Sequence, residues 1–367
     1  MHQVICRLQK WSRRSDLGAH VARQDRSEGD PSRLRRHSHP DRRGSPHGRG
    51  GSSPCRRPGD QLLHTARGYT VSEEIIGEAL APRRDQVIIA TKTPARDVDG
   101  VAADLEASLA KLRTNYIDLY QFHNVMNDQS LEKILAPGGA LAYLIQEQRR
   151  GRISHIGITS HRLETIIKAA ATGRFATVQF PFNFIETGAA KDLHPLAHRL
   201  GLGIIVMKPL AGGIFRNPAA AVRWVLAQPI DVAIPGVASI EEVEANLQAA
   251  SAGAPGSEDL ADLQSDATEL GPTFCRRCGY CVPCPEGIKT NFIASSELFF
   301  KRSGWGRVNP GHVATFRQGL ECRGCRTCEE RCPYGLPLSE LVPAISRRML
   351  ARIDALDPRP WLKQNGG

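Results

Sequence analysis

One stretch decides the fold: residues 64–93, HTARGYTVSEEIIGEALAPRRDQVIIATKT. Its first half contains SEEIIGEAL, whose apolar residues recur with helical spacing, and Ser72 stands where an N-cap is expected. Its second half contains DQVIIATK, a short β-branched run typical of a buried strand. The stretch therefore predicts a helix over 72–80 followed by a strand over 85–92.

The same alternation continues to residue 236. It predicts strands over 117–124, 153–160, 177–183, 202–210 and 231–236, with helices over 101–113, 131–151, 162–173, 192–201 and 218–228. Strands that alternate with helices favour an α/β fold with a parallel sheet. Six strands after residue 85, one truncated at residue 64 and one missing before it would make an incomplete (β/α)8 TIM-type barrel.

Charge divides the 367-residue chain unevenly. The formal net charge is +10, and residues 1–60 carry +8 of it. A basic segment of this kind admits a disordered tail that binds nucleic acid, but Trp11 is its only aromatic residue. We therefore expect no nucleic-acid partner. No apolar run approaches about 18 residues and no signal-peptide pattern is present, so we expect no membrane partner and a cytoplasmic protein.

Several motifs of the chain are similar to those of the aldo/keto reductases. They occur in family order, and the resemblance covers about residues 64–345, its cysteine-rich part resembling the subgroup with a ferredoxin-like iron–sulfur domain. The motifs are HTARGYTVSEEIIGEAL, VIIATKTP, NYIDLYQFHNV, GRISHIGITSH, VQFPFNF, VMKPLAGG and AIPGVASIEEVEANL.

The resemblance implies a catalytic tetrad of Asp, Tyr, Lys and His at the ends of the barrel strands. Tyr69, Lys92 and His123 match the last three, and His64 stands where the Asp is expected. In such a tetrad Tyr69 would protonate the carbonyl oxygen, and Lys92 would stabilise its phenolate. His123 would orient the carbonyl. A histidine cannot replace the carboxylate that keeps a buried lysine charged.

The resemblance also implies a site for NADPH or NADH. Ser160, His161 and Gln179 match the contacts to the nicotinamide amide, and Met207 takes the place of the residue that stacks on its ring. The loop KPLAGG matches the pyrophosphate loop, and a later helix matches the adenosine end. These loop and helix residues are Lys208, Pro209, Leu210, Gly212, Glu242 and Asn246.

Eight cysteines form two tight runs. CRRCGYCVPCP contains Cys275, Cys278, Cys281 and Cys284, and CRGCRTCEERCP contains Cys322, Cys325, Cys328 and Cys332. The second run has the spacing of bacterial ferredoxins, in which the fourth cysteine binds the other cluster. The simplest assignment is two [4Fe-4S] clusters, each completed by the last cysteine of the other run. Paired CxxC zinc sites are the alternative.

Residues 1–63 do not fit the pattern. Read one base later, the permitted codons of Ala22 through Asp41 can encode LGKTGLKVTRLGFGGIPIQ, and those of Pro58 through Leu63 can encode LGINFF. Because these strings have family order and end where the in-frame motif begins, we expect an out-of-frame, disordered basic segment. The remaining boundaries are expected at 64–253 for the barrel and 254–367 for an α-helical ferredoxin-like domain.

The sequence thus predicts an NADPH-linked reductase of an aldehyde or ketone, with iron–sulfur clusters that exchange electrons with a ferredoxin or flavoprotein or serve the structure alone. The loss of the first strand and of the tetrad Asp predicts an inactive chain. Two alternatives are an iron–sulfur electron-transfer or binding protein without reductase activity and a basic-tailed nucleic-acid binder.

Overall fold

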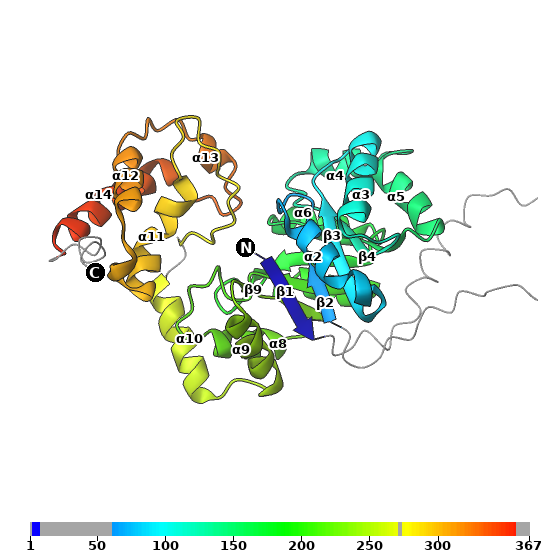
Figure 1. Ribbon diagram of the computed structural model, residues 1–367, viewed down its shortest axis with the longest axis horizontal. Coiled ribbons are helices and arrows are strands. Elements are labelled where there is room, and N and C mark those ends of the chain that lie inside the picture. The colour runs from blue at the N-terminus through cyan, green and yellow to red at the C-terminus, as the bar shows by residue number, and fades with distance from the viewer. Residues whose placement is uncertain (1, 8–60, 271–273, 357–367) are drawn as a thin grey trace, which may run out of the picture.

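The computed structural model describes residues 2–7, 61–270 and 274–356 (Figure 1). In these ranges no helix is both long and apolar enough to cross a membrane. Most of the segment expected to be out of frame, residues 8–60, lies outside the described residues.

Seven parallel strands form the wall of the barrel. They pair in chain order, each with the next, from the β2·β3 register Leu63↔Ile89 to the β7·β8 register Val206↔Ala233. Six of them follow residue 85, as the sequence predicts. The strands are β2 (Gln61–His64), β3 (Val87–Thr93), β4 (Ile117–Phe122), β5 (Ile153–Thr159), β6 (Thr177–Pro181), β7 (Gly203–Met207) and β8 (Val232–Ile234).

A strand also forms where the sequence predicts no order. β1 (His2–Arg7) pairs antiparallel with β2 on one side and with the two-residue β9 (Gly236–Val237) on the other. The barrel is therefore nearly closed, with an antiparallel strand where a parallel one is expected. On its other edge β2 pairs with β3 in parallel over four residues, from Gln61↔Val87 to His64↔Ala90.

Helices cover the outside of the sheet. Ser72 is the first residue of its helix rather than the N-cap, which is Val71, and its hydroxyl accepts a hydrogen bond from Thr65. The helix expected over 131–151 is broken in two around Pro137, Gly138 and Gly139, where Gly138 has φ +68°. The helices are α2 (Ser72–Leu80), α3 (Val98–Lys111), α4 (Asp128–Leu135), α5 (Ala140–Arg149), α6 (Leu163–Ala171), α7 (Leu193–Leu200), α8 (Pro218–Leu226) and α9 (Ile240–Ser251), with short 3₁₀ turns η2 (Ala81–Gln86) and η3 (Gly188–Ala190).

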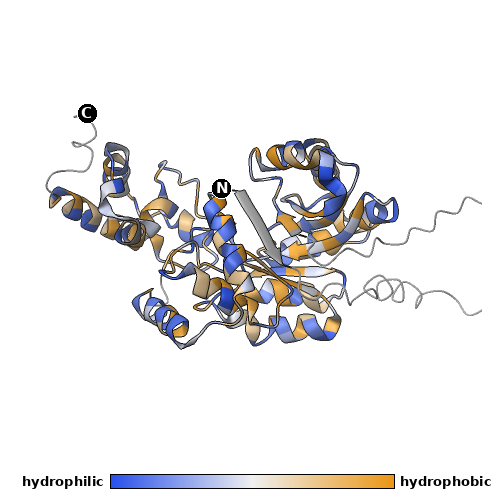
Figure 2. Ribbon diagram, turned by 60° about the horizontal axis from the view of Figure 1, so that its bottom comes forward, coloured by the Kyte–Doolittle hydropathy of each residue, from blue (hydrophilic) through white to orange (hydrophobic). Residues whose placement is uncertain are grey.

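Apolar residues on the strands and on the inner faces of the helices form one core. β4 is buried along its whole length, and the helices show alternating hydrophilic and hydrophobic stripes in Figure 2. A helix with one apolar stripe is stable only when that stripe is covered. The sheet covers it here, and the strand ends are left to carry polar side chains.

The C-terminal part is all helical and has a core of its own. It lies beside the barrel in Figure 1, where α10 (Ser257–Leu270) joins the two. Three of its cysteines, Cys281, Cys328 and Cys332, are buried in that core. Its helices are α11 (Thr290–Ser303), α12 (Pro310–Gly319), α13 (Thr327–Glu330) and α14 (Leu338–Asp354), with the turn η4 (Trp305–Arg307).

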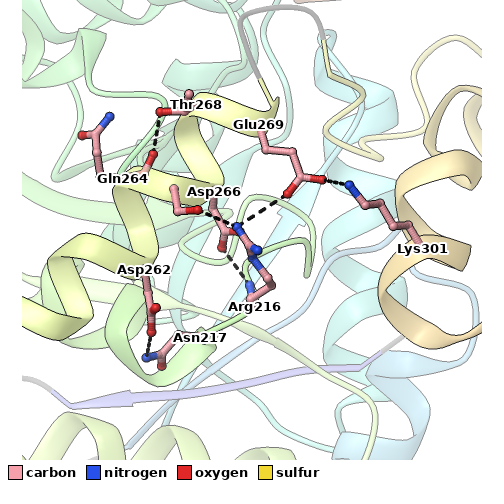
Figure 3. Close-up of polar contacts among 9 residues, drawn as sticks. Arg216, Asn217, Asp262, Gln264, Asp266, Thr268, Glu269 and Lys301 are labelled. Atoms are coloured by element: carbon pink, nitrogen blue, oxygen red, sulfur yellow. Dashed lines mark hydrogen bonds and ion pairs between the residues drawn. The ribbon is translucent and has the colours of Figure 1, made fainter.

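Charged groups fix α10 to both parts. Asp266 is fully buried and accepts hydrogen bonds from the backbone N–H and Nε of Arg216, at 2.8 and 2.6 Å (Figure 3). One turn further on, Glu269 pairs with Lys301 of α11. The connection is therefore a braced helix whose carboxylates contact the barrel on one side and the C-terminal domain on the other.

Candidate active site and cluster sites

Three strand ends bring Tyr69, Lys92 and His123 together. Tyr69 lies in the loop after β2, Lys92 is in β3, and His123 directly follows β4. The Nζ atom of Lys92 is 4.9 Å from the centroid of the Tyr69 ring, and the rings of Tyr69 and His123 are 5.7 Å apart, edge to face. Three residues that are far apart in the sequence thus lie close together at neighbouring strand ends, as their positions in the sequence predict.

His64 occupies the fourth position of this cluster. It is the last residue of β2, is 1% exposed, and has its ring centroid 6.4 Å from that of Tyr69. Neither ring nitrogen is within hydrogen-bond geometry of a described group, although the Gln179 side chain is near enough to raise the pKa of His64 against the other influences. Burial, together with the charges of Lys92 and His123, holds the pKa of His64 well below its ordinary value. His64 is therefore neutral and supplies no counter-charge.

Lys92 is fully buried, and among the described residues no carboxylate lies at hydrogen-bonding distance from it. Its Nζ donates to the backbone carbonyl of Thr65 at 2.7 Å. Burial lowers the pKa of Lys92 well below its ordinary value, and burial raises the pKa of Tyr69 to about 12. Both shifts oppose the reaction expected here, since proton donation by the phenol needs a charged ammonium beside it.

Glu73 is a buried carboxylate that the sequence reasoning missed. It lies in the first turn of α2 and accepts hydrogen bonds from Thr91 and Ser108, each at 2.7 Å. Arg67 donates to its other oxygen at 3.2 Å. The charge of Glu73 raises the pKa of Lys92 against the effect of burial. The signal was the SE pair at the start of an amphipathic helix, which also suits an ordinary capping role.

Two expected nicotinamide contacts lie at the same end of the barrel. Gln179 is in β6 and donates from Nε2 to the sulfur of Met207 at 3.5 Å, while its buried Oε1 has no partner among the described residues. A buried acceptor without a donor is costly, so this oxygen fits a ligand that donates, as a nicotinamide carboxamide does. The hydroxyl of Ser160 donates to the carbonyl of Val125 at 2.7 Å.

His161, expected at the same amide, instead contacts the C-terminal domain. Its Nδ1 is 2.9 Å from the hydroxyl of Tyr334, and its ring is 5.0 Å from that of Tyr280. Burial first, and then the charge of Lys208, lower the pKa of His161 to about 3. A neutral imidazole thus joins the end of β5 to the cysteine-rich domain.

The expected pyrophosphate loop also packs against that domain. Gly212 has φ +85°, and a Cβ there would lie 3.2 Å from the carbonyl oxygen of Arg276. Arg277 reaches the carbonyl of Gly212 at 3.5 Å. Lys208 has φ +59°. Burial lowers its pKa, and the Cys278 thiol is the largest of the influences that oppose this shift. This loop therefore lies between the barrel and the first cysteine run.

The residues expected at the adenosine end lie on α9. Glu242 accepts a hydrogen bond from the N–H of Ala238 at 2.7 Å, and Ser239 caps the helix by accepting from the N–H of Glu242 at 3.3 Å. Asn246 is half-buried one turn further on. These contacts order the start of α9, and the nucleotide role of Glu242 and Asn246 stays a prediction.

Four cysteines line one small cavity in the C-terminal domain. They come from both runs and are the set that the sequence assigned to one cluster: Cys275, Cys278, Cys281 and Cys332. The backbone N–H of Arg277 donates to the Cys275 sulfur at 3.4 Å and the hydroxyl of Thr290 to the Cys281 sulfur at 3.3 Å. Hydrogen bonds to sulfur are among the means by which proteins tune iron–sulfur centres, so this donor set fits a cluster.

The other four cysteines are more open. Burial, together with the neighbouring Cys281 and Cys322, raises the pKa of the Cys328 thiol to about 11. Cys325, in contrast, is exposed. No disulfide joins any of the eight, and within the described ranges no three or more His, Cys, Asp or Glu side chains could hold a single metal ion. The pairing of Cys284 with Cys322, Cys325 and Cys328 stays a prediction.

The chain thus joins a parallel α/β barrel with Tyr, Lys and His at its strand ends to a cysteine-lined domain. Comparison with known families agrees. Residues 58–220 match the aldo/keto reductase family and residues 274–336 match the 4Fe-4S dicluster domain. Two regions of the chain, one after the other, thus match the aldo/keto reductase family and the 4Fe-4S dicluster domain.

Several curated proteins are similar to the first domain. An uncharacterized oxidoreductase of Bacillus subtilis is 31% identical over 190 residues, which are 44% of this chain and 56% of that protein. A probable aldo-keto reductase of Glycine max is 29% identical over 160 residues, 40% of this chain and 44% of that protein. The chain thus spans about half the length of these relatives.

Solved structures resemble the chain at low identity. An aldo-keto reductase from Klebsiella pneumoniae in complex with NADPH is 24% identical, with a TM-score of 0.48 over 56% of this chain and 78% of that one. The holo form of an aldo-keto reductase from Bacillus halodurans is 22% identical, with a TM-score of 0.49 over 56% of this chain and 82% of that one.

Proposed function

We propose that the barrel binds NADPH and reduces an aldehyde or ketone, and that the reaction is slow because His64 stands in place of a carboxylate. The observation that carries the proposal is the cluster of Tyr69, Lys92 and His123, with the Lys92 ammonium 4.9 Å from the Tyr69 ring. NADPH supplies a hydride to the carbonyl carbon. The protein must then deliver a proton to the oxygen as negative charge develops on it, which is the task of a general acid.

Each residue of the cluster has a defined part in this reaction. Tyr69 donates the proton, Lys92 stabilises the phenolate left behind, and His123 donates a hydrogen bond to the carbonyl oxygen. His123 is suited to this, because burial, with the charge of Lys92, holds its pKa well below the ordinary value and keeps the ring neutral. Gln179 Oε1 would accept from the nicotinamide carboxamide.

The slow rate follows from His64. Burial lowers the pKa of Lys92 and raises that of Tyr69, and a neutral imidazole at position 64 supplies no carboxylate to offset either shift. The absence of a charge partner in a buried site costs several kcal/mol, and each ~1.4 kcal/mol is tenfold in rate.

The same shifts favour a second candidate function, an iron–sulfur electron-transfer protein in which the barrel does no carbonyl chemistry. For that role we propose two [4Fe-4S] clusters that exchange electrons with a ferredoxin or flavoprotein, and a cytoplasmic location. The completeness of the cysteine set around the cavity supports it. Both functions use the same clusters and differ in the barrel.

Anaerobically purified holoprotein separates them. NADPH oxidation is followed with a panel of aldehydes and ketones, alongside Tyr69→Phe. Slow turnover that Tyr69→Phe abolishes supports the reductase. NADPH oxidation that Tyr69→Phe leaves unchanged, or none with any carbonyl, contradicts it and leaves the electron-transfer function. Iron, sulfide and zinc are measured on the same samples, and stoichiometric zinc would exclude the clusters.

A further inference from the structure

One aromatic ring of the iron–sulfur domain lies against the barrel. Tyr280 stands between two cluster cysteines, Cys278 and Cys281, so its backbone is held wherever the first cluster is held. Its ring packs on His161, at the end of β5, with the ring planes 73° apart. Residues at the carboxyl ends of barrel strands surround the place where the chemistry of such barrels occurs.

The electrostatic neighbours of Tyr280 belong to the candidate active site. Burial raises the pKa of Tyr280, and the hydroxyl of Tyr69 raises it further. Arg96, in the loop after β3, opposes that rise. The Arg96 guanidinium in turn donates to the backbone carbonyls of His123 and Asn124. Tyr280 thus lies against His161 and close to both Tyr69 and Arg96.

Three further contacts hold this arrangement in place. Tyr334 accepts or donates at Nδ1 of His161, and Arg276 lies over the Tyr334 ring at 4.6 Å. Arg276 is also paired with Glu186 of the barrel at 3.2 Å. His161 therefore has little freedom to turn away, and the Tyr280 ring is fixed on it from the domain side.

We propose that Tyr280 forms a wall of the carbonyl substrate site, so that the iron–sulfur domain limits the size of the substrates the barrel accepts. The proposal rests on the reductase function proposed above. A rigid aromatic ring beside the proton donor admits a small or flat carbonyl compound and excludes a wider one. The barrel site is then complete only when the second domain is docked.

The test compares Tyr280→Ala and Tyr280→Phe with Tyr334→Phe, which removes the His161 hydrogen bond and keeps both rings. In each holoprotein kcat/KM is measured for benzaldehyde and for 2-naphthaldehyde. Calorimetry on the NADP-loaded proteins gives Kd for the two corresponding alcohols, which needs no turnover. Iron content is measured on every sample.

Tyr280→Ala should shift the naphthyl-to-phenyl ratio of Kd and of kcat/KM by about tenfold toward the wider compound, since pocket shape changes of this size carry such factors. Tyr280→Phe and Tyr334→Phe should keep the wild-type ratio, with iron unchanged.

An unchanged ratio in an iron-replete Tyr280→Ala protein overturns the proposal, as does loss of iron with an equal fall for both compounds. If neither aldehyde is reduced by the wild type, the reductase function fails, and the ratio of alcohol Kd values still tests Tyr280. Absence of binding of either alcohol to the wild type also overturns the proposal.

Discussion

The two parts of the molecule differ in how completely each holds the side chains that its proposed chemistry needs. In the cysteine-rich domain, the four thiols proposed to bind the first cluster line one cavity. The barrel brings Tyr69, Lys92 and His123 together, but a neutral His64 stands at the position where the proposed tetrad would have a carboxylate. A buried imidazole without partners is tolerated by the fold, whereas the proton chemistry depends on the missing charge.

The sharpest way to break the comparison is to remove one cluster ligand. Cys278→Ser should lower the iron content of anaerobic holoprotein from about eight to about four atoms per chain, because one of two four-iron clusters loses a ligand. Iron and sulfide determination with the visible spectrum measures this. Thr290→Val, which removes only the hydrogen bond to Cys281, is the matched control and should retain the iron. Full iron in Cys278→Ser would contradict the ligand assignment.

The next largest effect should come from Glu73. Glu73→Ala removes a buried carboxylate with three donors and leaves Arg67 only its longer contact with Asp104 at 3.9 Å, so we expect a loss of about 3 kcal/mol in the free energy of unfolding. Chemical denaturation measures it. Glu74→Ala, at the exposed neighbouring position, should change the free energy by less than about 0.5 kcal/mol. Equal effects of the two variants would mean that Glu73 is not the buried anchor described.

His64→Asp sharpens the comparison by restoring the charge. Carbonyl reduction should rise by about tenfold to a hundredfold, since a carboxylate next to Lys92 raises the pKa of the ammonium and favours the phenolate of Tyr69. The charged ammonium is the active form, so the rate falls as pH rises through the pKa of Lys92. In the wild type burial places that fall at a lower pH than for an ordinary lysine, and the variant should move it to higher pH. His64→Asn is the uncharged control, and a gain of the same size with it would refute the charge argument.

The smallest effect should be at the connection. Asp266→Asn keeps the shape of the helix and weakens the contact with Arg216, which is half exposed, so we expect a loss of about 1 kcal/mol. Glu258→Gln, exposed on the same helix, should have no measurable effect. Denaturation followed separately by barrel fluorescence and by cluster absorbance measures the effects of both variants. A larger effect of Glu258→Gln would mean that Asp266 is not the residue that fixes α10 to the barrel.

The barrel and the clustering of Tyr69, Lys92 and His123 could be predicted from the sequence for a physical reason. β-branched runs such as VIIATK and polar residues at strand ends are local signals, and Tyr69, Lys92 and His123 each carry one. β1 has no such signal, because it is one short strand at the edge of a charge-rich segment and pairs antiparallel with β2. The PGG sequence at residues 137–139 is a signal for a break in the helix. The apolar residues with helical spacing on both sides nevertheless favoured one continuous helix.

Tyr280 and Glu73 were missed for a different reason. Tyr280 lies inside a cysteine motif, where spacing draws attention to the ligands, and its contact with His161 joins residues more than a hundred positions apart. Glu73 meets Thr91 and Ser108 only when α2, β3 and α3 pack together. Tertiary contacts of this kind leave no pattern in a single chain.

The contacts between the two domains have a consequence for how the protein can change over generations. Arg162 approaches the carbonyl of Cys332 at 3.4 Å and Arg277 that of Gly212 at 3.5 Å, so on each side an arginine meets main chain. A main-chain acceptor survives almost any replacement of its own side chain. Both acceptor positions are nevertheless constrained for other reasons, since Cys332 lines the cysteine cavity and Gly212 has φ +85°. Deep mutational scanning should therefore find the joint intolerant at Arg162 and Arg277 and also at these two positions.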